Sequence, residues 1–455
     1  MLLLDYPEWS NFNINDYMFV MNMVKLTPEL QGMSDLLDDE SFEKPILNRF
    51  NTRRGRPSVP LRVYIRMMVL KFILGLSYEN LTPVIMRTPM YKIFCHIPMD
   101  QDVPTPTALM KITKKYGEST IQEINESLVV KLKELKLVKG NRARIDSTVV
   151  EGNICHPTDA GLLFEGVRRI HEAVSRCRKF CSETVRKTNK VVSEQKKRLL
   201  SISKVAKRRS EEKVSEVRKI VQEMAQCAKQ EILKAKKQLS KFRAENMREK
   251  QLLNNIHSTC SKLETVIEQA ESIDKGEVNI KGRMVSYHDP DVHPIKKGKP
   301  GKQVQFGMVA QIEEAENGII AAYQVYKGNP SDKTLMPDAM ESHKKIFGKA
   351  PREVTADRGY YTSKLDEELH KMGVKHVCVP KTGRKSKARE AQENTLKFKE
   401  LKSWRAGIEA RISCLKRSFG FDRSMLRGIS GAKTWCGYGV FAHNLRQAAR
   451  LMASN

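Results

Sequence analysis

Hydrophobic positions along the chain follow two different periods, and the change of period divides the chain. Between residues 61 and 74, and again between 107 and 135, apolar residues recur every three or four positions, which predicts buried helices. Beyond Gly140 the stretch ARIDSTVVEGN alternates and is rich in β-branched residues, which predicts a strand. A helical first part is therefore followed by a part that contains a sheet.

The helical first part divides again near residue 51. Residues 1–51 mix short apolar runs with acidic stretches and predict a supporting helical segment. Residues 52–137 begin with a basic stretch, after which Gly75 and the prolines near residue 105 separate successive helices. We expect residues 52–137 to form a helical DNA-binding domain, with a plain scaffold as the alternative. Three arginines before its helices are candidates for phosphate contacts: Arg53, Arg54 and Arg56.

A long segment without helix breakers follows the predicted strand. No glycine or proline occurs between Gly166 and Gly276, so we expect residues 161–276 to be a helical insertion. One helix of this length would extend roughly 160 Å, which favours a folded-back helical hairpin with its turn near Ser210. Apolar residues at three- and four-residue steps predict its coiled-coil-like seam: Val214, Val217, Val221, Met224, Ala228, Leu252, Ile256, Leu263 and Ile267.

The charge of this insertion favours a role in binding DNA. Residues 161–250 contain 26 Lys and Arg against 11 Asp and Glu, a net charge of +15. We favour an arm that grips DNA over an ordinary solvated surface, because such an excess attracts a polyanion. The same arm is also a candidate for joining two protomers through its apolar seam.

After the insertion, strand and helix patterns alternate, which predicts an α/β domain made of residues 138–160 and 277–455. Two strand-like runs flank the turn AENG and predict a β-hairpin. The elements that follow are a helix at 333–347, a strand that ends at Asp357, a helix at 363–372, a strand at 375–380, and helices at 404–420 and 428–455.

The composition of the whole chain favours a nucleic-acid partner. Its 455 residues contain 81 Lys and Arg against 53 Asp and Glu, a net charge of +28, with 40% hydrophobic and 7% aromatic residues. These fractions exclude a fully disordered basic protein. The sequence has no run of about 20 apolar residues, and the opening MLLLDYPEWSNF does not resemble a signal peptide. We therefore expect a soluble cytoplasmic protein, associated with the nucleoid when it is bound to DNA, and no membrane partner.

Nine cysteines are spread along the chain without a C-x-x-C pair, which is typical of a reducing compartment. Cys177 and Cys181 lie one helical turn apart, but the neighbouring sequence supplies no obvious further ligands for a metal. Helix packing is the favoured interpretation for this pair.

Three acidic residues are candidates for one catalytic site. Asp146 lies within the first predicted strand, Asp357 ends a later strand, and Glu409 lies on a helix expected to flank the sheet. In an open α/β sheet the carboxyl ends of neighbouring strands meet at one crevice. Carboxylates gathered there suit Mg²⁺, with Mn²⁺ as a substitute, and a pair of such ions stabilises phosphoryl transfer. Taken singly, each acid would more often be a surface residue.

Three stretches that contain these acids resemble the motif blocks of bacterial insertion-sequence DDE transposases. They read ARIDSTVVEGNICHPTD, VTADRGYY and WRAGIEARISCLKRSFGFDRSMLRG. The segment GRPSVPLRVYIRMMVLKFILGLSYENL resembles the helical amino-terminal domain of this family, and SYHDPDVHPIKKGKPGKQVQFG resembles its stretch before the second strand. The resemblance implies a ribonuclease H-like fold, a mixed sheet with flanking helices, in which Asp146, Asp357 and Glu409 bind the metal ions.

The last block also resembles a family signature, Y-x2-R-x3-E-x6-K. Arg405, Glu409 and Lys416 have the matching spacing, whereas Lys402 stands in place of the tyrosine. Many relatives have their large insertion between the fifth strand and the glutamate helix, but here it follows the strand of Asp146. We therefore expect a helical arm at this place in the chain.

Other polar and aromatic residues near these blocks are weaker candidates for a functional role. Candidates for DNA contact are Arg358, Trp404, Arg405 and Lys416. The alternative is pairing with an acid for Arg358, core packing for Trp404, and helix solvation for Arg405 and Lys416. His156 and His288 are not predicted to be ligands, because a lone histidine is more often surface or packed. Asp289 and Asp291 lie in a D-P-D sequence that predicts a turn.

These expectations lead to one main functional hypothesis. The protein would cut the ends of an insertion sequence with water as nucleophile, and would then join the freed 3′-hydroxyls to target DNA. Its partners would be double-stranded DNA, namely terminal inverted repeats and target, and it would act as a homodimer in the DNA complex. The alternatives are a ribonuclease H-like nuclease without strand transfer, and a DNA-binding protein derived from a transposase that has lost catalysis.

Overall fold

The computed structural model describes residues 24–47, 58–178, 189–205, 210–240, 243–277, 280, 282–296 and 304–454. It divides into two compact units, one formed by residues 1–153 and 307–455 and the other by residues 154–306. The predicted phosphate contacts at Arg53, Arg54 and Arg56, and the cysteine at position 181, lie outside the described residues.

The amino-terminal part of the first unit is helical, as predicted. Its helices are α2 (Pro28–Leu37), η1 (Glu40–Phe42), α3 (Lys44–Leu47), α4 (Leu61–Ile73), α5 (Tyr78–Arg87), α6 (Pro89–Phe94) and α7 (Pro106–Glu134). Helix α4 is buried along most of its length, because its apolar residues face neighbours on several sides. Ser77 caps α5 and Thr105 caps α7, each by accepting a hydrogen bond from a backbone N–H of the first turn.

A mixed sheet forms the centre of the first unit. Its strands are β1 (Arg142–Gly152), β3 (Gln305–Glu314), β4 (Ile320–Tyr326), β5 (Glu353–Ala356), β6 (His376–Cys378) and the short β7 (Arg423–Ser424). The order across the sheet is β4-β3-β1-β5-β6, and β7 pairs with the end of β1. β1, β3 and β4 are antiparallel neighbours, whereas β5 and β6 run parallel to β1. The predicted hairpin of β3 and β4 is confirmed.

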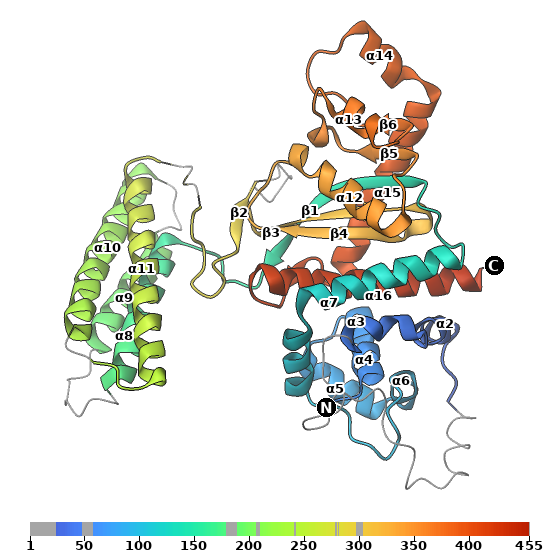
Figure 1. Cartoon of the computed structure of the whole chain (residues 1–455). Coiled ribbons are helices and arrows are strands. Elements are labelled where there is room, and N and C mark those ends of the chain that lie inside the picture. The colour runs from blue at the N-terminus through green and yellow to red at the C-terminus, as the bar shows by residue number, and fades with distance from the viewer. Residues whose placement is uncertain are drawn as a thin grey trace. The chain divides into compact units, whose positions relative to one another are not determined.

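Helices flank this sheet (Figure 1). They are α12 (Met336–Phe347), α13 (Leu365–Lys371), α14 (Lys387–Asn394), α15 (Leu396–Ser418) and α16 (Gly428–Ala453). Helices α12 and α13 pack with Ile145, Val354 and Ala356, and this apolar cluster forms one face of the core. Helix α16 packs along α7 and against β4, where Asn444 bonds both the N–H and the C=O of Ile320 (2.9 and 2.8 Å).

The second unit contains helices α8 (Asp159–Arg178), α9 (Asn189–Val205), α10 (Glu211–Leu239) and α11 (Met247–Asp274), and the short strand β2 (His293–Ile295). The break predicted near Ser210 is present, since Ser210 caps α10, and a further break separates α10 from α11. The expected two-helix hairpin is wrong: the described helices form a bundle of four.

The core of the second unit explains why its helices form a bundle. Most of the predicted seam is buried, including Met224, Ala228 and Ile256 at 0% exposure, but Val214 is 49% exposed. Helix α8 adds its own apolar face, with Leu163 and Val167 buried in the same cluster. A hairpin of two helices would leave that face in water, and burying it in a bundle is more favourable.

The insertion leaves and re-enters the sheet at facing positions. Glu151 on β1 is paired with Gly307 on β3, close to each end of the intervening unit. A Cβ at Gly307 would collide with the backbone oxygen of Val150, so the close approach of the strands requires glycine here. The insertion therefore occupies the place of a connection between two adjacent antiparallel strands.

No helix in the described part of the chain combines the length and apolar character needed to cross a membrane.

Candidate active site

The register between β1 and β5 brings two predicted acids to neighbouring positions. The last paired residues of these parallel strands are Ile145 and Ala356, and the next residue along each strand is an aspartate, Asp146 and Asp357. Asp146 is half-buried and Asp357 is exposed. Each Oδ1 accepts a hydrogen bond from the N–H of the following residue, at 2.7 Å in Asp146 and 2.8 Å in Asp357. These bonds restrict how the two carboxylates are oriented.

Helix α15 lies over the face of β1 to which Arg144 points. The Arg144 guanidinium donates to the carbonyl oxygen of Trp404 at 2.5 Å, and a Cβ at Gly407 would collide with Arg144 Nη1. Further along, Lys416 Nζ donates to the carbonyl oxygen of Val149 at 2.7 Å. Because side chains alternate along a strand, Asp146 shares the face of Arg144 and so the face that α15 covers.

Glu409 lies between these two anchoring points of α15. Its neighbours Ile408, Ile412 and Leu415 are buried against the unit, whereas the Glu409 side chain is 69% exposed. The carboxylate forms an ion pair with Arg405, one helical turn earlier, at 3.5 Å. The sequence prediction of a helix that flanks the sheet and carries this glutamate is therefore confirmed.

A buried ion cluster fixes α15 on the sheet, and sequence reasoning missed it. Glu314 on β3 has a side-chain exposure of 0%, and both of its oxygens accept bonds from Arg144, at 2.8 and 2.6 Å. Arg411 of α15 adds a third bond to Glu314 at 3.2 Å. Arg411 also donates to His443 of α16 at 3.0 Å. Burial and the adjacent Arg411 lower the pKa of His443 to about 3, so this histidine is neutral in the folded protein.

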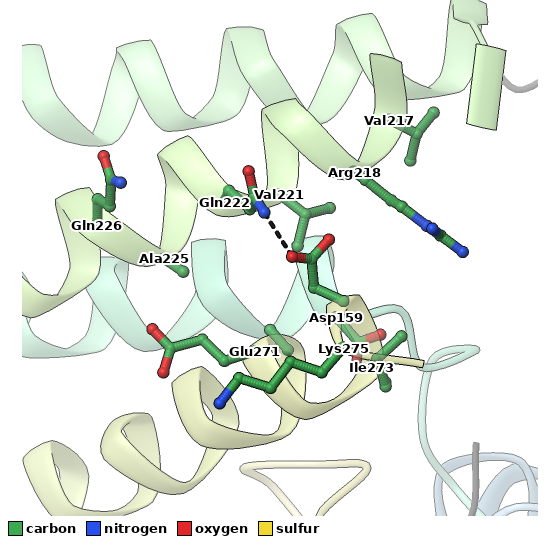
Figure 2. Close-up of a pocket in the computed structure, with 12 residues that line it drawn as sticks. Asp159, Val217, Arg218, Val221, Gln222, Ala225, Gln226, Glu271, Ile273 and Lys275 are labelled. Carbon is green, nitrogen blue, oxygen red and sulfur yellow. Dashed lines mark hydrogen bonds between the residues drawn. The ribbon is translucent and has the colours of Figure 1, made fainter. Parts of the chain in front are cut away.

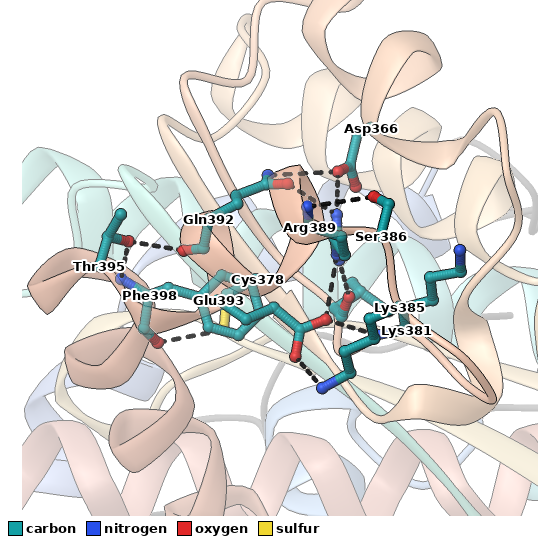
Figure 3. A network of polar contacts seen from close by, with 11 residues as sticks. Asp366, Cys378, Lys381, Lys385, Ser386, Arg389, Gln392, Glu393, Thr395 and Phe398 are labelled. Carbon is teal, nitrogen blue, oxygen red and sulfur yellow. Dashed lines mark hydrogen bonds and ion pairs between the residues drawn. The ribbon is translucent and has the colours of Figure 1, made fainter.

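The segment between β6 and α15 is short and held by polar contacts (Figure 3). Arg389 of α14 binds Asp366 at 2.5 Å, Glu393 at 3.0 Å and the carbonyl oxygen of Val379 at 2.5 Å. Glu393 in turn accepts bonds from the N–H of Lys381 (2.9 Å) and the ammonium of Lys385 (2.6 Å). This network sets where α15 begins, and it agrees with the expectation that no large insertion lies here.

The carboxylates of the candidate site have the chemistry that Mg²⁺ prefers, because hard cations bind oxygen ligands. Asp146 lies within β1, Asp357 directly follows the adjacent strand β5, and Glu409 lies on the helix above them, so all three can supply such oxygens. Within the described residues, no group of three or more His, Cys, Asp and Glu side chains is close enough together to hold a metal ion. The fit of the site to a metal therefore rests on donor chemistry and register.

The predicted DNA-contact residues have different surroundings. Lys416 is half-buried, and its ammonium donates a hydrogen bond to the carbonyl oxygen of Val149. This bond gives Lys416 a structural role, since it joins α15 to β1. The Trp404 ring lies beneath the guanidinium groups of Arg142 and Arg144, at 4.6 and 4.9 Å from its centroid. Arg358 is exposed beside Asp357, and Lys402 is exposed on α15. DNA contact by these residues, and by Arg405, stays a prediction.

The D-P-D turn is confirmed as a turn. Asp289 is 4% exposed, its N–H donates to Ser286 Oγ at 3.1 Å, and its Oδ1 accepts from the N–H of Asp291 at 3.2 Å. Of the two histidines set aside from the sequence, His156 packs edge-on against Phe306, with ring centroids 5.5 Å apart.

A cavity of about 430 Å³ lies in the four-helix unit, between α10 and the end of α11 (Figure 2). Its three carboxylates are all paired: Asp159 with Arg283 (2.7 Å), Glu271 with Lys229 (2.5 Å), and Asp274 with Gln222 (2.5 Å). These carboxylates already have partners within the same unit, so the carboxylates on and beside β1 and β5 are the better candidates for catalysis.

Two family models match the chain. One, described as Transposase DDE domain, matches residues 281–445, and the other, described as Transposase domain (DUF772), matches residues 20–115. The first includes Asp357 and Glu409, and Asp146 lies outside both matches, so its place in the site rests on the register of β1 with β5. The search of curated proteins and the search of solved structures each found no match.

Proposed function

Because the chain belongs to the DDE transposases of insertion sequences, we propose that it cuts DNA at the ends of a mobile element and joins the freed 3′-hydroxyls to target DNA. One observation carries the proposal. Asp146 and Asp357 follow the last paired residues of two adjacent parallel strands, and α15 with Glu409 covers the same face.

In this proposal Asp146, Asp357 and Glu409 hold two Mg²⁺ ions, with Mn²⁺ as a substitute. When bound, such ions stabilise both the attacking and the leaving oxygen of a phosphoryl transfer. The protein itself supplies fixed carboxylates. The backbone N–H of Ser147 and that of Arg358 orient the two aspartates, and Arg405 pairs with Glu409. Arg358 and Arg405 are proposed to contact phosphates beside this site.

The helical insertion is proposed to grip DNA outside the site. Residues 179–209 contain eleven Lys and Arg against two Glu, a net charge of +9, and this is the most basic stretch of the insertion. Within it, α9 exposes Lys196 and Lys197 on its surface. A surface of this charge attracts the phosphate backbone without reading its sequence.

The first prediction tests the acidic triad. Replacing Asp146, Asp357 or Glu409 with Ala should abolish cleavage of a duplex that carries the element's end, because each change removes a metal-binding carboxylate. DNA affinity should stay unchanged, since phosphate contacts come from the basic surfaces. Cleavage is followed on a labelled duplex in Mg²⁺, and binding by fluorescence anisotropy.

Glu400→Ala is the matched control for this experiment. Glu400 lies on the same helix as Glu409, is 52% exposed, and pairs only at the surface with Lys397 and Arg142 among the contacts described. This variant should cleave like the wild type. A triad variant that still cleaves would remove its residue from the site. Cleavage without joining of pre-cut 3′-hydroxyl ends to target DNA would favour the alternative, a nuclease without strand transfer.

A further inference from the structure

A fourth carboxylate lies close to residues that follow the two aspartates, on the turn between β4 and α12. Asp332 begins the short helix η3 (Asp332–Thr334) and is half-buried. It is far in sequence from both aspartates and belongs to none of the three motif blocks. Its contacts, however, connect the two segments on which those aspartates lie.

The first contact is with β1. Ser147 Oγ donates a hydrogen bond to Asp332 Oδ1 at 2.6 Å. Ser147 directly follows Asp146, and its backbone N–H is the group that binds the Asp146 carboxylate. A hydroxyl that donates to a carboxylate forms a short, charge-assisted bond, which restrains Ser147 strongly.

The second contact is with the turn that follows β5. Asp332 Oδ2 lies 3.3 Å from the position that a Cβ would occupy on Gly359, so the carboxylate packs close to this turn. Gly359 is in η4 (Arg358–Tyr360), whose cap is Asp357. One carboxylate therefore touches the residue next to one aspartate and the turn that begins at the other.

The surroundings of this bridge are buried and polar. Side chains alternate along β1, so Ser147 lies on the opposite face from Asp146 and from α15. On that face Gln311 of β3 donates to the hydroxyl of Tyr360 at 3.4 Å, and Tyr360 is 0% exposed. Asp332 thus binds β1 on the face opposite to the Asp146 side chain and to α15.

We propose that Asp332 is a positioning residue of the active site, which sets the separation of Asp146 and Asp357 by bridging Ser147 and the Gly359 turn. This inference rests on the proposed function, because it assigns Asp332 a role in forming the metal site. Residues that orient metal ligands in this way usually change metal affinity by 10- to 100-fold when they are replaced.

The test compares Asp332→Ala with Asp338→Ala. Asp338 has the same charge, lies on α12 close in sequence, and accepts a bond from the Tyr326 hydroxyl at 2.9 Å. We expect Asp332→Ala to raise the Mg²⁺ concentration for half-maximal cleavage about tenfold, and to weaken Mn²⁺ binding measured by calorimetry similarly. Asp338→Ala should change neither quantity. Equal behaviour of the two variants would overturn the inference.

Ser147→Ala provides a second route, which also serves if Asp332→Ala does not fold. It removes the same hydrogen bond and leaves Asp332 in place, so it should raise the Mg²⁺ requirement in the same direction. The double variant should be no worse than the more affected single variant, because both changes remove the same hydrogen bond. Fully additive effects would contradict the bridge. A wild type without metal-dependent cleavage would instead contradict the proposed function.

Discussion

His443 shows how one buried side chain makes stability depend on pH. It is 2% exposed in α16, accepts a bond from Arg411 Nη1 at 3.0 Å, and faces Asn444 Oδ1 at 3.2 Å. Its pKa is lowered to about 3 by burial and by Arg411, whereas an unfolded histidine has a pKa of about 6.5. The folded state therefore excludes a proton that the unfolded state binds below about pH 6.5.

We predict that the buried His443 makes the folded protein less stable in mild acid. The stability that His443 contributes is complete above about pH 6.5 and declines as pH falls toward 3, at about 1.4 kcal/mol per pH unit. At pH 5 the decline amounts to about 2 kcal/mol. His443→Gln keeps an acceptor for Arg411 but does not titrate, so its stability should fall less between pH 7 and 5. Urea unfolding at both pH values measures the difference.

A control at an exposed histidine completes this comparison. His376 is exposed at the start of β6, and His376→Gln should follow the wild-type pH dependence. Identical pH slopes for the wild type and His443→Gln would show that His443 is not the group that resists protonation.

At the scale of elements, the four-helix insertion forms a compact unit of its own, so it can be tested by deletion. Glu151 and Gly307 face each other on β1 and β3, so a short linker in place of residues 154–306 would close an ordinary hairpin. We predict that this deletion leaves a folded first unit with weaker DNA binding. The slope of log K against log salt should become shallower by about 0.9 for every phosphate that the shortened protein no longer binds. Anisotropy titrations at several salt concentrations measure that slope.

Point variants assign the effect to one helix of the unit. Replacing exposed Lys196 and Lys197 of α9 with Gln should reduce the salt slope. Lys250 on α11 and Lys275 beside it are also exposed and form the matched control pair. Replacing them with Gln should leave the salt slope unchanged, because α11 carries more acidic than basic residues. A deletion or a Lys196/Lys197 variant with an unchanged slope would mean that the insertion does not grip DNA.

The apolar seam of the insertion is mostly buried within one protein chain, so its buried residues cannot also form a dimer interface. Met224 and Ile256 are 0% exposed inside the bundle, so truncating either side chain to Ala would destabilise this unit by about 2–5 kcal/mol. A joining role for the insertion would have to use residues that remain exposed, such as Val214. Homodimer formation in the DNA complex stays a proposal.

For the whole molecule, the net charge of +28 and the carboxylate site predict that binding and cleavage are separable. Removing divalent metal with a chelator should abolish cleavage, while DNA binding should persist because it depends on Lys and Arg. Added Mg²⁺ or Mn²⁺ should restore cleavage. The same chain is assayed for both properties in one buffer series. Cleavage that survives thorough chelation would contradict metal-dependent phosphoryl transfer.

The sequence by itself determined the local elements and the candidate acids. Periods of three to four residues identified α4, α7 and α15, and alternation identified β1 and the β3–β4 hairpin, because these patterns arise from how a short segment buries its own apolar side chains. The lack of Gly and Pro located the helical insertion, because these two residues are the poorest helix formers. Asp146, Asp357 and Glu409 could be selected because each lies at a recognisable place within, or directly after, a predicted strand or helix.

Only the tertiary structure decided which segments meet. The register of Asp146 with Asp357, the burial of Glu314 between Arg144 and Arg411, and the bond from Lys416 to Val149 all join residues far apart in the chain. The change from a hairpin to a four-helix bundle has the same origin, since the seam pattern is equally compatible with two helices or four. Local periodicity states which face is buried, but what covers that face depends on the packing of the folded chain.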